Sequence, residues 1–469
     1  MIQFGTGGWR AIIGDDFIKS NIQKLAEGVY RLMKADHKLD QPVVIGRDRR
    51  FLSDEAAHWM TEVLCAHGVT VWVMKRSVPT PLVMHTVLKH GLHFGLQVTA
   101  SHNPPEYNGV KLIAEEGRDA PVELTDRLQE YINQVTEYPV MPYQEAKAKG
   151  LAISLHAPFN DYLDDIISQI DMASIRNGNP RILFDPMHGS GIYALMVILY
   201  TARATIDSIH FDRDTLFGGS MPAPTPETLT ELTARVKSGK YELGIALDGD
   251  GDRLGIIDAN GRYINANETL VMLYYYLHEI KGWKGPVVRN LGTTHMLDKV
   301  AASFGEKCYE VPVGFKYISA KIDEKDAVLG GESSGGLTVR GHIHGKDSTY
   351  AAALFVEMIC SLKKTPSQII DELTEKYGEY HMVEDNLRFQ PEDYSRINRI
   401  LMQEKQLPDF GKEIDHVSYQ DGCKVYFKDD SFALCRFSGT ESLLRIFSEA
   451  GKKETAREYC DCFRSFLHI

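Results

Sequence analysis

The chain repeats a pattern in which apolar runs end in polar loops. In the first copy, strand-like runs at 43–45 and 70–74 precede a third run, 94–98, which leads into the loop 99–105. Ser53 follows the first run and precedes apolar residues at helical spacing, so we expect it to cap a helix. Strands that alternate with helices predict α/β layers.

Two further copies follow the first. In the second copy, the run 182–184 meets Asp185-Pro186, and the run 243–247 leads into the acidic loop 248–252. A fainter third copy starts at 287–289 and ends in the glycine-rich loop 331–336. Loops at the same strand ends of related domains could meet at one cleft.

The last part of the chain has a different pattern of apolar and polar residues. Strand-like runs at 424–427 and 432–437 precede an amphipathic helix over 453–466, which predicts a smaller α+β domain. The fold class expected is therefore α/β, with three topologically similar α/β domains and a C-terminal α+β domain around a central active-site cleft. The expected domains are 1–150, 151–258, 259–375 and 376–469.

Composition narrows the class of protein. A chain of 469 residues is too long for one core, and 43% hydrophobic with 25% charged residues is ordinary for a soluble protein. The N-terminus lacks the features of a signal peptide, and no apolar run is long enough to span a bilayer. The seven cysteines form no CxxC pair, so we expect a cytoplasmic protein without a disulfide framework.

The net charge of −12 argues against a nucleic-acid partner, because such a partner requires a basic face. An anionic substrate would need basic groups focused in one cleft, or a metal ion.

The loop 99–105 is the first candidate for chemistry. Asn103-Pro104 favours a tight turn that would expose the hydroxyl of Ser101. His102 and Lys111 would then be close enough to move a proton or to offset negative charge. The alternative is a serine that merely bonds to the nearby backbone.

The second candidate is a set of aspartates at alternate positions, Asp248, Asp250 and Asp252. Their oxygens can surround a hard cation, and a site with few protein ligands suits Mg²⁺ in phosphoryl transfer. A calcium-binding EF-hand is disfavoured because Arg253 and Ala259 stand where that loop needs glycine and glutamate. A solvated acidic turn is the remaining alternative.

The third candidate is a set of residues suited to bind phosphate, which we call the phosphate clamp: Arg436, Ser438, Gly439 and Thr440, with Arg445 farther on. Guanidinium groups, hydroxyls and glycine N–H groups all suit phosphate oxygens, although an ordinary turn with surface arginines has the same composition.

In the glycine-rich loop, Glu332 and Ser334 could bond to sugar hydroxyls, or the loop could be a plain turn. We interpret Lys346-Asp347 and the segment 5–10 as surface loops.

Together these motifs resemble the α-D-phosphohexomutases, the phosphoglucomutase/phosphomannomutase family. TASHNP with NGVK, DGDGDR, GESSGG and RFSGTESLLRIFSEA are similar, in this order, to the four loops of that family. FGTGGWR, GRDRR and FDPMHGSG match its other markers, so the resemblance extends from residue 4 to about residue 450.

The resemblance implies that Ser101 is a phosphoserine and that Ser101 and the three aspartates hold Mg²⁺. It implies sugar recognition by Glu332 and Ser334 and a grip on the non-reacting phosphate by Arg436, Ser438, Gly439, Thr440 and Arg445. We expect Arg10 and Arg253 to offset phosphate charge. Lys111 is the first candidate for proton transfer or for a fixed phosphate ligand, with His102 and Lys316 as alternatives.

Several residues depart from the family pattern. Phe437 and Ser442 replace two prolines, Gly336 replaces a histidine, and Gly314-Phe315 replaces Gly-His. With Lys316, the last of these changes resembles the glucose-type members.

The expected reaction interconverts glucose 1-phosphate and glucose 6-phosphate, with glucose 1,6-bisphosphate as primer and intermediate. Mannose, glucosamine and pentose phosphates are alternative substrates, and a Mg²⁺-dependent phosphatase and a non-catalytic sensor are alternative functions. We expect a monomer or homodimer with no nucleic-acid or membrane partner.

Overall fold

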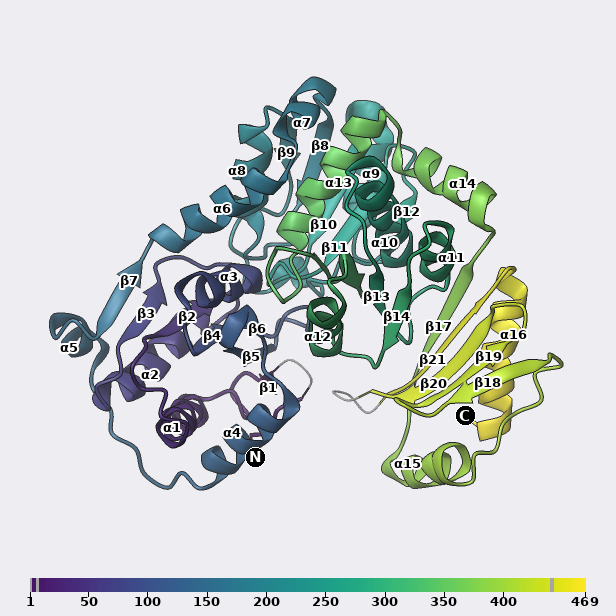
Figure 1. Ribbon diagram of the computed structural model, residues 1–469. Coiled ribbons are helices and arrows are strands. Elements are labelled where there is room, and N and C mark those ends of the chain that lie inside the picture. Colours follow the sequence, from purple (N-terminus) through teal and green to yellow (C-terminus); the bar gives the residue numbers. More distant parts are fainter. Residues whose placement is uncertain (1, 6–7, 439–442) are drawn as a thin grey trace. The chain divides into compact units, whose positions relative to one another are not determined.

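The computed structural model describes residues 2–5, 8–438 and 443–469, and the chain divides into two compact units (Figure 1). Unit 1 comprises Met1–Ala266 and Ser334–Ser367, and unit 2 comprises Asn267–Ser333 and Gln368–Ile469.

The first sheet of unit 1 has seven strands in the order β1-β5-β4-β2-β3-β7, with β6 beside β5. The strands are β1 (Trp9–Ile12), β2 (Val43–Arg47), β3 (Val71–Met74), β4 (Phe94–Val98), β5 (Tyr107–Ala114), β6 (Arg118–Asp119) and β7 (Ala152–Leu155). The strands β4, β2, β3 and β7 run parallel, whereas β5 is antiparallel to β4 and β1. The helices of this region are α1 (Lys19–Ala35), α2 (Ser53–Ala66), α3 (Thr80–His90), α4 (Val122–Asn133) and α5 (Tyr143–Ala148).

Local sequence explains where α3 begins and ends. Pro81 stands in its first turn, where a proline costs no intrahelical hydrogen bond. Gly91 ends the helix in the left-handed conformation, with φ of 62°. The first residue of α3, Thr80, is thereby held at a defined place.

The second sheet of unit 1 has the order β12-β11-β10-β8-β9. Its strands are β8 (Arg181–Asp185), β9 (Thr205–Ser208), β10 (Leu243–Leu247), β11 (Leu254–Asp258) and β12 (Tyr263–Ile264). The strand β8 lies parallel to β9 and β10, and β10 and β11 form an antiparallel hairpin whose connection is the acidic loop. Unit 1 also contains α6 (Ala157–Gln169), α7 (Met172–Gly178), α8 (Ile192–Thr201), α9 (Thr230–Arg235), β16 (Leu337–Val339) and α13 (Ser348–Leu362).

Unit 2 contains a parallel arrangement in which β13 (Val287–Asn290) lies between β14 (Cys308–Val311) and β15 (Leu329–Gly331). Its helices are α10 (Ala266–Tyr275), which starts at the boundary, α11 (Met296–Ser303), α12 (Phe315–Lys325) and α14 (Pro366–Tyr377), which crosses it.

Unit 2 ends with an antiparallel sheet in the order β17-β21-β20-β19-β18. The strands are β17 (His381–Arg388), β18 (Ile414–Ser418), β19 (Cys423–Phe427), β20 (Phe432–Phe437) and β21 (Leu443–Ala450), and α15 (Pro391–Asn398) and α16 (Lys453–Leu467) accompany them. Figure 1 shows α16 lying along this sheet, where it packs on β21 and β17.

The predicted fold class is confirmed, with alternating helices and strands followed by a small C-terminal sheet domain. The residue boundaries of the four expected domains stay a prediction. Within the described ranges, no helix is long and apolar enough to cross a membrane. All seven cysteines are free thiols.

One helix-cap prediction was wrong. Ser53 is the first residue of α2 rather than its cap, and Leu52 precedes it with φ of 63°. The hydroxyl of Ser53 donates to the buried carboxylate of Asp48, at 2.8 Å from Oδ1, and therefore does not cap the helix.

Candidate active site

Ser101 lies in a tight turn directly after β4. The amide of Asn103 donates to the carbonyl of Ala100 at 3.1 Å, which closes the turn that Asn103-Pro104 predicted. Ser101 has φ of 54°, a left-handed conformation that a non-glycine residue keeps only when its surroundings enforce it.

The guanidinium of Arg50 supplies much of that enforcement. Arg50 is fully buried and donates to the carbonyl of Ser101 at 2.7 Å. It also donates to the carbonyls of Asn103, Pro104 and Tyr107. A lysine could not serve these acceptors with one compact ammonium group, whereas the planar guanidinium does. Sequence reasoning missed Arg50, which was noted only as part of the GRDRR marker.

A buried carboxylate supports the same turn. Asp48 accepts from the hydroxyl of Thr99 at 2.6 Å, and the Thr99 oxygen in turn accepts from the amide of Ser101 at 2.8 Å. The chain Asp48–Thr99–Ser101 therefore fixes the backbone from which the Ser101 hydroxyl projects.

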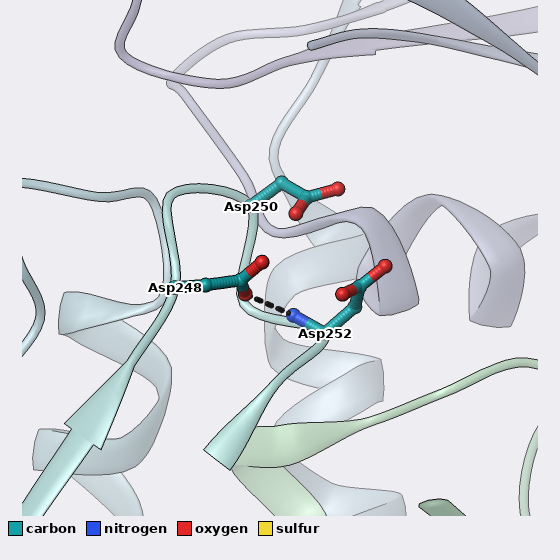
Figure 2. A group of neighbouring side chains, drawn as sticks. All are labelled: Asp248, Asp250 and Asp252. Carbon is teal, nitrogen blue, oxygen red and sulfur yellow. Dashed lines mark hydrogen bonds between the residues drawn. The ribbon is translucent and has the colours of Figure 1, made fainter. Parts of the chain in front are cut away.

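The acidic loop connects β10 to β11 and gathers Asp248, Asp250 and Asp252 (Figure 2). One carboxylate oxygen from each of them lies within 4.8 Å of the others, and all three side chains are buried. Asp248 Oδ1 accepts from the amide of Asp252 at 2.8 Å, which draws the loop closed. Burial, and after it the charges of Asp252 and Asp250, raises the pKa of Asp248 well above its usual range.

The set of donors fits a divalent cation. Asp250 Oδ1 and Asp252 Oδ1 are buried and accept no hydrogen bond from the described residues. Buried carboxylate oxygens without partners are costly, and a hard cation would satisfy them. The side chains that would hold Mg²⁺ are Asp248, Asp250 and Asp252, with the oxygen on Ser101 beside them.

The serine and the acidic loop meet. Ser101 Oγ donates to Asp248 Oδ2 at 3.1 Å. The two backbones also approach closely here, since a Cβ on Gly249 would lie only 2.7 Å from the carbonyl oxygen of Ser101. Thr80, at the start of α3, donates from its hydroxyl to Asp250 Oδ2 at 2.5 Å and thereby orients that carboxylate.

Lys111 reaches the same cluster from β5. Its ammonium group donates to Asp250 Oδ2 at 2.7 Å and to Asp252 Oδ2 at 2.9 Å. Burial alone would lower the pKa of Lys111, but the two carboxylates outweigh it and raise that pKa far above its usual range.

The other predicted catalytic residues contact Ser101, its turn or the acidic loop. His102 Nδ1 is 3.4 Å from Ser101 Oγ, and burial lowers the pKa of His102 well below its usual range. Arg10 donates from Nη1 to Asn103 Oδ1 at 2.8 Å. Arg253 follows the acidic loop directly, with Nε 4.0 Å from Asp252 Oδ1.

Part of the glycine-rich loop belongs to unit 1 and lies beside the acidic loop. The amide of Leu254 donates to the carbonyl of Gly335 at 3.3 Å, which places Ser334–Gly336 next to Arg253. The side chain of Lys346 packs against Gly336, where a Cβ would lie 2.1 Å from Cδ of that lysine.

Lys346-Asp347 is more than the surface loop expected from sequence. Lys346 Nζ lies 3.4 Å from Asp252 Oδ2, so this lysine joins the charges around the acidic loop. Asp347 is fully buried, caps α13 by accepting from the amide of Tyr350, and also accepts from the hydroxyl of Tyr162. The position of Lys346 beside Asp252 could not be read from its sequence neighbours.

Glu332 and Lys316 belong to unit 2. Glu332 is buried and accepts from the side-chain amide of Asn290 at 3.4 Å. Lys316 stands in the first turn of α12, with Nζ 5.2 Å from the ring centre of Tyr317. Phe315, next to it, packs into an apolar cluster with Val288 and Ile318.

The described part of the predicted phosphate clamp is also in unit 2. Arg436 on β20 is directly opposite Arg445 on β21. Each guanidinium also lies near a carboxylate, Arg436 Nη2 at 3.2 Å from Asp421 Oδ1 and Arg445 Nη1 at 4.0 Å from Glu384 Oε1. Two neighbouring guanidinium groups are suited to an anion such as phosphate. The Nε of Arg436 is buried without a hydrogen-bond partner among the described residues. The amide of Ser438 donates to the carbonyl of Leu443, and Gly439 and Thr440 lie outside the described residues.

Unit 1 therefore brings Ser101, His102, Lys111, Arg10, Arg253, Ser334 and the three aspartates to one place, and unit 2 carries Lys316, Glu332, Arg436, Ser438 and Arg445. The combination in unit 1 of a strained buried serine, an acidic cluster and cationic side chains suits phosphoryl transfer, which depends on positioning and charge stabilisation.

Comparisons with known proteins agree with this chemistry. Models of three domains match in chain order: "Phosphoglucomutase/phosphomannomutase, alpha/beta/alpha domain I" over residues 1–139, domain II over 160–261 and domain III over 265–377.

Two curated relatives match almost the whole chain. A phosphoglucomutase/phosphomannomutase from Thermococcus kodakarensis is 28% identical over 459 residues, covering 98% of this chain and 96% of its own. A phosphoglucosamine/phosphogalactosamine mutase from Sulfurisphaera tokodaii is 26% identical over 464 residues, covering 97% and 96%.

The fold has a solved counterpart. The crystal structure of a phosphoglucomutase/phosphomannomutase family protein from Burkholderia thailandensis aligns with a TM-score of 0.82 at 23% identity, covering 100% of this chain and 98% of that one. The three consecutive domain models, with the two curated relatives, establish the family. The chain belongs to the phosphoglucomutase/phosphomannomutase family and is a phosphohexomutase, an isomerase.

Proposed function

We propose that this phosphohexomutase interconverts α-D-glucose 1-phosphate and glucose 6-phosphate through a phosphoserine at Ser101. The hydrogen bond between Ser101 Oγ and Asp248 Oδ2 is the observation that carries the proposal. It puts a hydroxyl nucleophile in contact with an acidic cluster that has the donor set for Mg²⁺.

In the first half-reaction, the phosphoryl group leaves the Ser101 oxygen and bonds to the free hydroxyl of the sugar phosphate. The product is glucose 1,6-bisphosphate, which also serves as the primer of an unphosphorylated enzyme. After the bisphosphate turns over, its other phosphoryl group returns to Ser101 and the isomerised monophosphate leaves. Both ester bonds are conserved, so no phosphate is lost to water.

The side chains around Ser101 have separable roles in this scheme. Bound Mg²⁺ would supply charge neutralisation at the phosphoryl oxygens. Lys111, held by Asp250 and Asp252, acts as a fixed cation, and Arg253 and Arg10 offset the charge of the phosphoserine. We assign the proton of the attacking hydroxyl to His102, whose Nδ1 lies 3.4 Å from Ser101 Oγ and whose pKa is lowered by burial, so that its imidazole can accept a proton. Lys346, beside Asp252, adds a further cation.

The opposed pair Arg436 and Arg445 binds the phosphate that is not reacting. An anion site separate from Ser101 would let the sugar bind in either orientation. Glu332 and Ser334 bind the sugar hydroxyls, and Lys316 contributes a further cation.

The glucose preference has its own support. The segment Gly314-Phe315-Lys316 resembles glucose-type members. The relatives differ in the sugars that their names specify, which makes mannose and glucosamine phosphates the alternatives to exclude.

The test is a coupled assay with the 1-phosphates of glucose, mannose, glucosamine and ribose, with and without Mg²⁺ and glucose 1,6-bisphosphate. We expect the highest kcat/KM with glucose 1-phosphate, dependence on Mg²⁺, and loss of turnover in Ser101→Ala. Ser238→Ala is the matched control, because among the described residues the hydroxyl of Ser238 bonds only to the carbonyl of Arg235.

Other outcomes separate the alternatives. Equal rates on all four sugars would defeat the glucose assignment. Release of inorganic phosphate in place of the isomer would indicate a phosphatase, and binding without turnover would indicate a sensor.

A further inference from the structure

Asp421 links two substrate-binding elements of unit 2 that the proposed function uses. It lies in the turn between β18 and β19 and has partners on two other elements. Its Oδ1 accepts from Arg436 Nη2 at 3.2 Å, and its Oδ2 accepts from the amide of Val313 at 2.9 Å. One carboxylate therefore joins the arginine of the phosphate clamp to the segment that leads into α12.

The turn that carries Asp421 is built against Arg436. Gly422 has φ of 95°, and a Cβ there would lie 2.5 Å from Cβ of Arg436 and 2.6 Å from the carbonyl of Cys435. A larger residue would force the turn away from β20. The distance between Asp421 and Arg436 is therefore fixed by the backbone as well as by the ion pair.

Arg436 and its neighbour across the sheet each have an acidic partner. Arg436 is directly opposite Arg445 across the strand pair, and Arg445 has a carboxylate of its own, with Nη1 4.0 Å from Glu384 Oε1. Asp421 engages one amino group of Arg436 and offsets part of its charge. The carboxylate is thus placed to hold the side chain in one orientation before a phosphate arrives.

The hydrogen bond from the amide of Val313 connects Asp421, and through it Arg436, to the start of α12. Val313 precedes Gly314, which has φ of 133° and stands at the N-terminus of α12, and Lys316 follows in the first turn of that helix. A shift of the 313–316 segment would therefore be transmitted through Asp421 to Arg436.

We propose that Asp421 is a positioning residue for recognition of the non-reacting phosphate: it orients Arg436 and ties it to the segment that carries Lys316. The proposal rests on the assignment of Arg436 to that phosphate in the proposed function.

The experiment compares Asp421→Asn and Asp421→Ala with the wild type. Asp421→Asn keeps the size of the side chain and an acceptor for the amide of Val313, but it removes the charge that Arg436 meets. We expect KM for glucose 1-phosphate to rise roughly tenfold in Asp421→Asn, because one charge-assisted hydrogen bond to Arg436 is lost. The rise should be larger in Asp421→Ala. Asp415→Asn, an exposed aspartate of β18 that bonds to His416, is the control and should match the wild type.

A double-mutant cycle separates positioning from a general structural role. In an Arg436→Ala background, Asp421→Asn should change KM less than about twofold, because its effect passes through Arg436. An equal, additive loss in both backgrounds would overturn the proposal, as would a wild-type KM in Asp421→Asn. Thermal unfolding of each variant identifies any loss that comes from misfolding, and Asp421→Asn is the variant that decides if Asp421→Ala does not fold.

A binding measurement distinguishes failure of this inference from failure of the proposed function. Calorimetric titration with glucose 6-phosphate should show a Kd raised roughly tenfold in Asp421→Asn, with no further rise in the Arg436→Ala background. If that pattern holds while the wild type turns over no hexose phosphate, the proposed function fails and the role of Asp421 stands. If turnover is normal but neither KM nor Kd moves in Asp421→Asn, the role of Asp421 fails.

Discussion

Ser101 Oγ lies 3.1 Å from Asp248 Oδ2, although 147 residues separate the two in the chain. The contact joins the proposed nucleophile to the acidic loop. Arg50 supports the Ser101 turn and Thr80 orients Asp250 of the acidic loop, and these supports can be tested separately from the groups proposed to react.

Thr80→Val should lower kcat roughly tenfold, because it removes the hydroxyl that orients Asp250 and leaves a buried carboxylate oxygen without that donor. Steady-state kinetics at saturating substrate measures the change. Thr86→Val is a matched control in the same helix, since within the described part of the chain the hydroxyl of Thr86 bonds only to the carbonyl of Leu82. The kcat of this variant should stay within about twofold of the wild type. Unchanged kcat in Thr80→Val would contradict a positioning role for this hydroxyl.

Removal of divalent cations by a chelator should abolish turnover, and added Mg²⁺ should restore it. The same ion should raise the Tm, because it binds the folded protein through the three buried aspartates. Asp250→Asn should weaken this rise in Tm, whereas the surface variant Asp207→Asn should retain it. A full Mg²⁺-dependent rise in Asp250→Asn would place the ion elsewhere.

Arg50→Lys should reduce turnover roughly tenfold or more and should also lower the Tm. One ammonium group cannot replace a guanidinium that donates to four carbonyls of the Ser101 turn, and each orphaned buried acceptor costs about 1–3 kcal/mol. The exposed Arg235→Lys, which keeps its pair with Glu231, is the control and should behave as the wild type. Normal kinetics in Arg50→Lys would show that the turn holds its shape without these bonds.

Lys424 gives a prediction about pH. Burial, followed by the charge of Arg289, lowers the pKa of Lys424 to about 7, although Glu310 opposes the shift. Between that value and its ordinary pKa, the unfolded chain binds this proton and the folded chain does not. The free energy of unfolding should therefore rise with pH above about 7, by up to about 1.4 kcal/mol per pH unit from this group.

Lys424→Met should remove that contribution, so the stability of the wild type relative to the variant should increase from pH 7 to pH 9. Thermal unfolding at both values measures the difference. Lys428→Met, at an exposed position of the same hairpin, should show no such trend. A difference between the wild type and Lys424→Met that stays constant with pH would refute the assigned pKa.

Sequence was sufficient to predict which candidate residues lie close together; their chemical roles stay predictions. Ser101 and the three aspartates stand at the ends of strands that apolar runs predicted, and their side chains meet as expected. Their supports could not be predicted, because Arg50 and Thr80 act on residues that lie close only after the sheets have formed.

The same limit explains Ser53 and Lys346. A serine before a helical pattern is ordinarily a cap, but a buried carboxylate five residues earlier competes for the hydroxyl of Ser53. The position of Lys346 could not be predicted either, because its side chain packs over Gly336, a neighbour that only the folded chain provides.

The opposed residues Arg436 and Arg445 have a consequence for the stability of the C-terminal sheet. If the non-reacting phosphate binds to both guanidinium groups, as proposed, it links strands β20 and β21 through their side chains as well as their backbones. Hexose phosphate should then raise the Tm of the sheet that binds it.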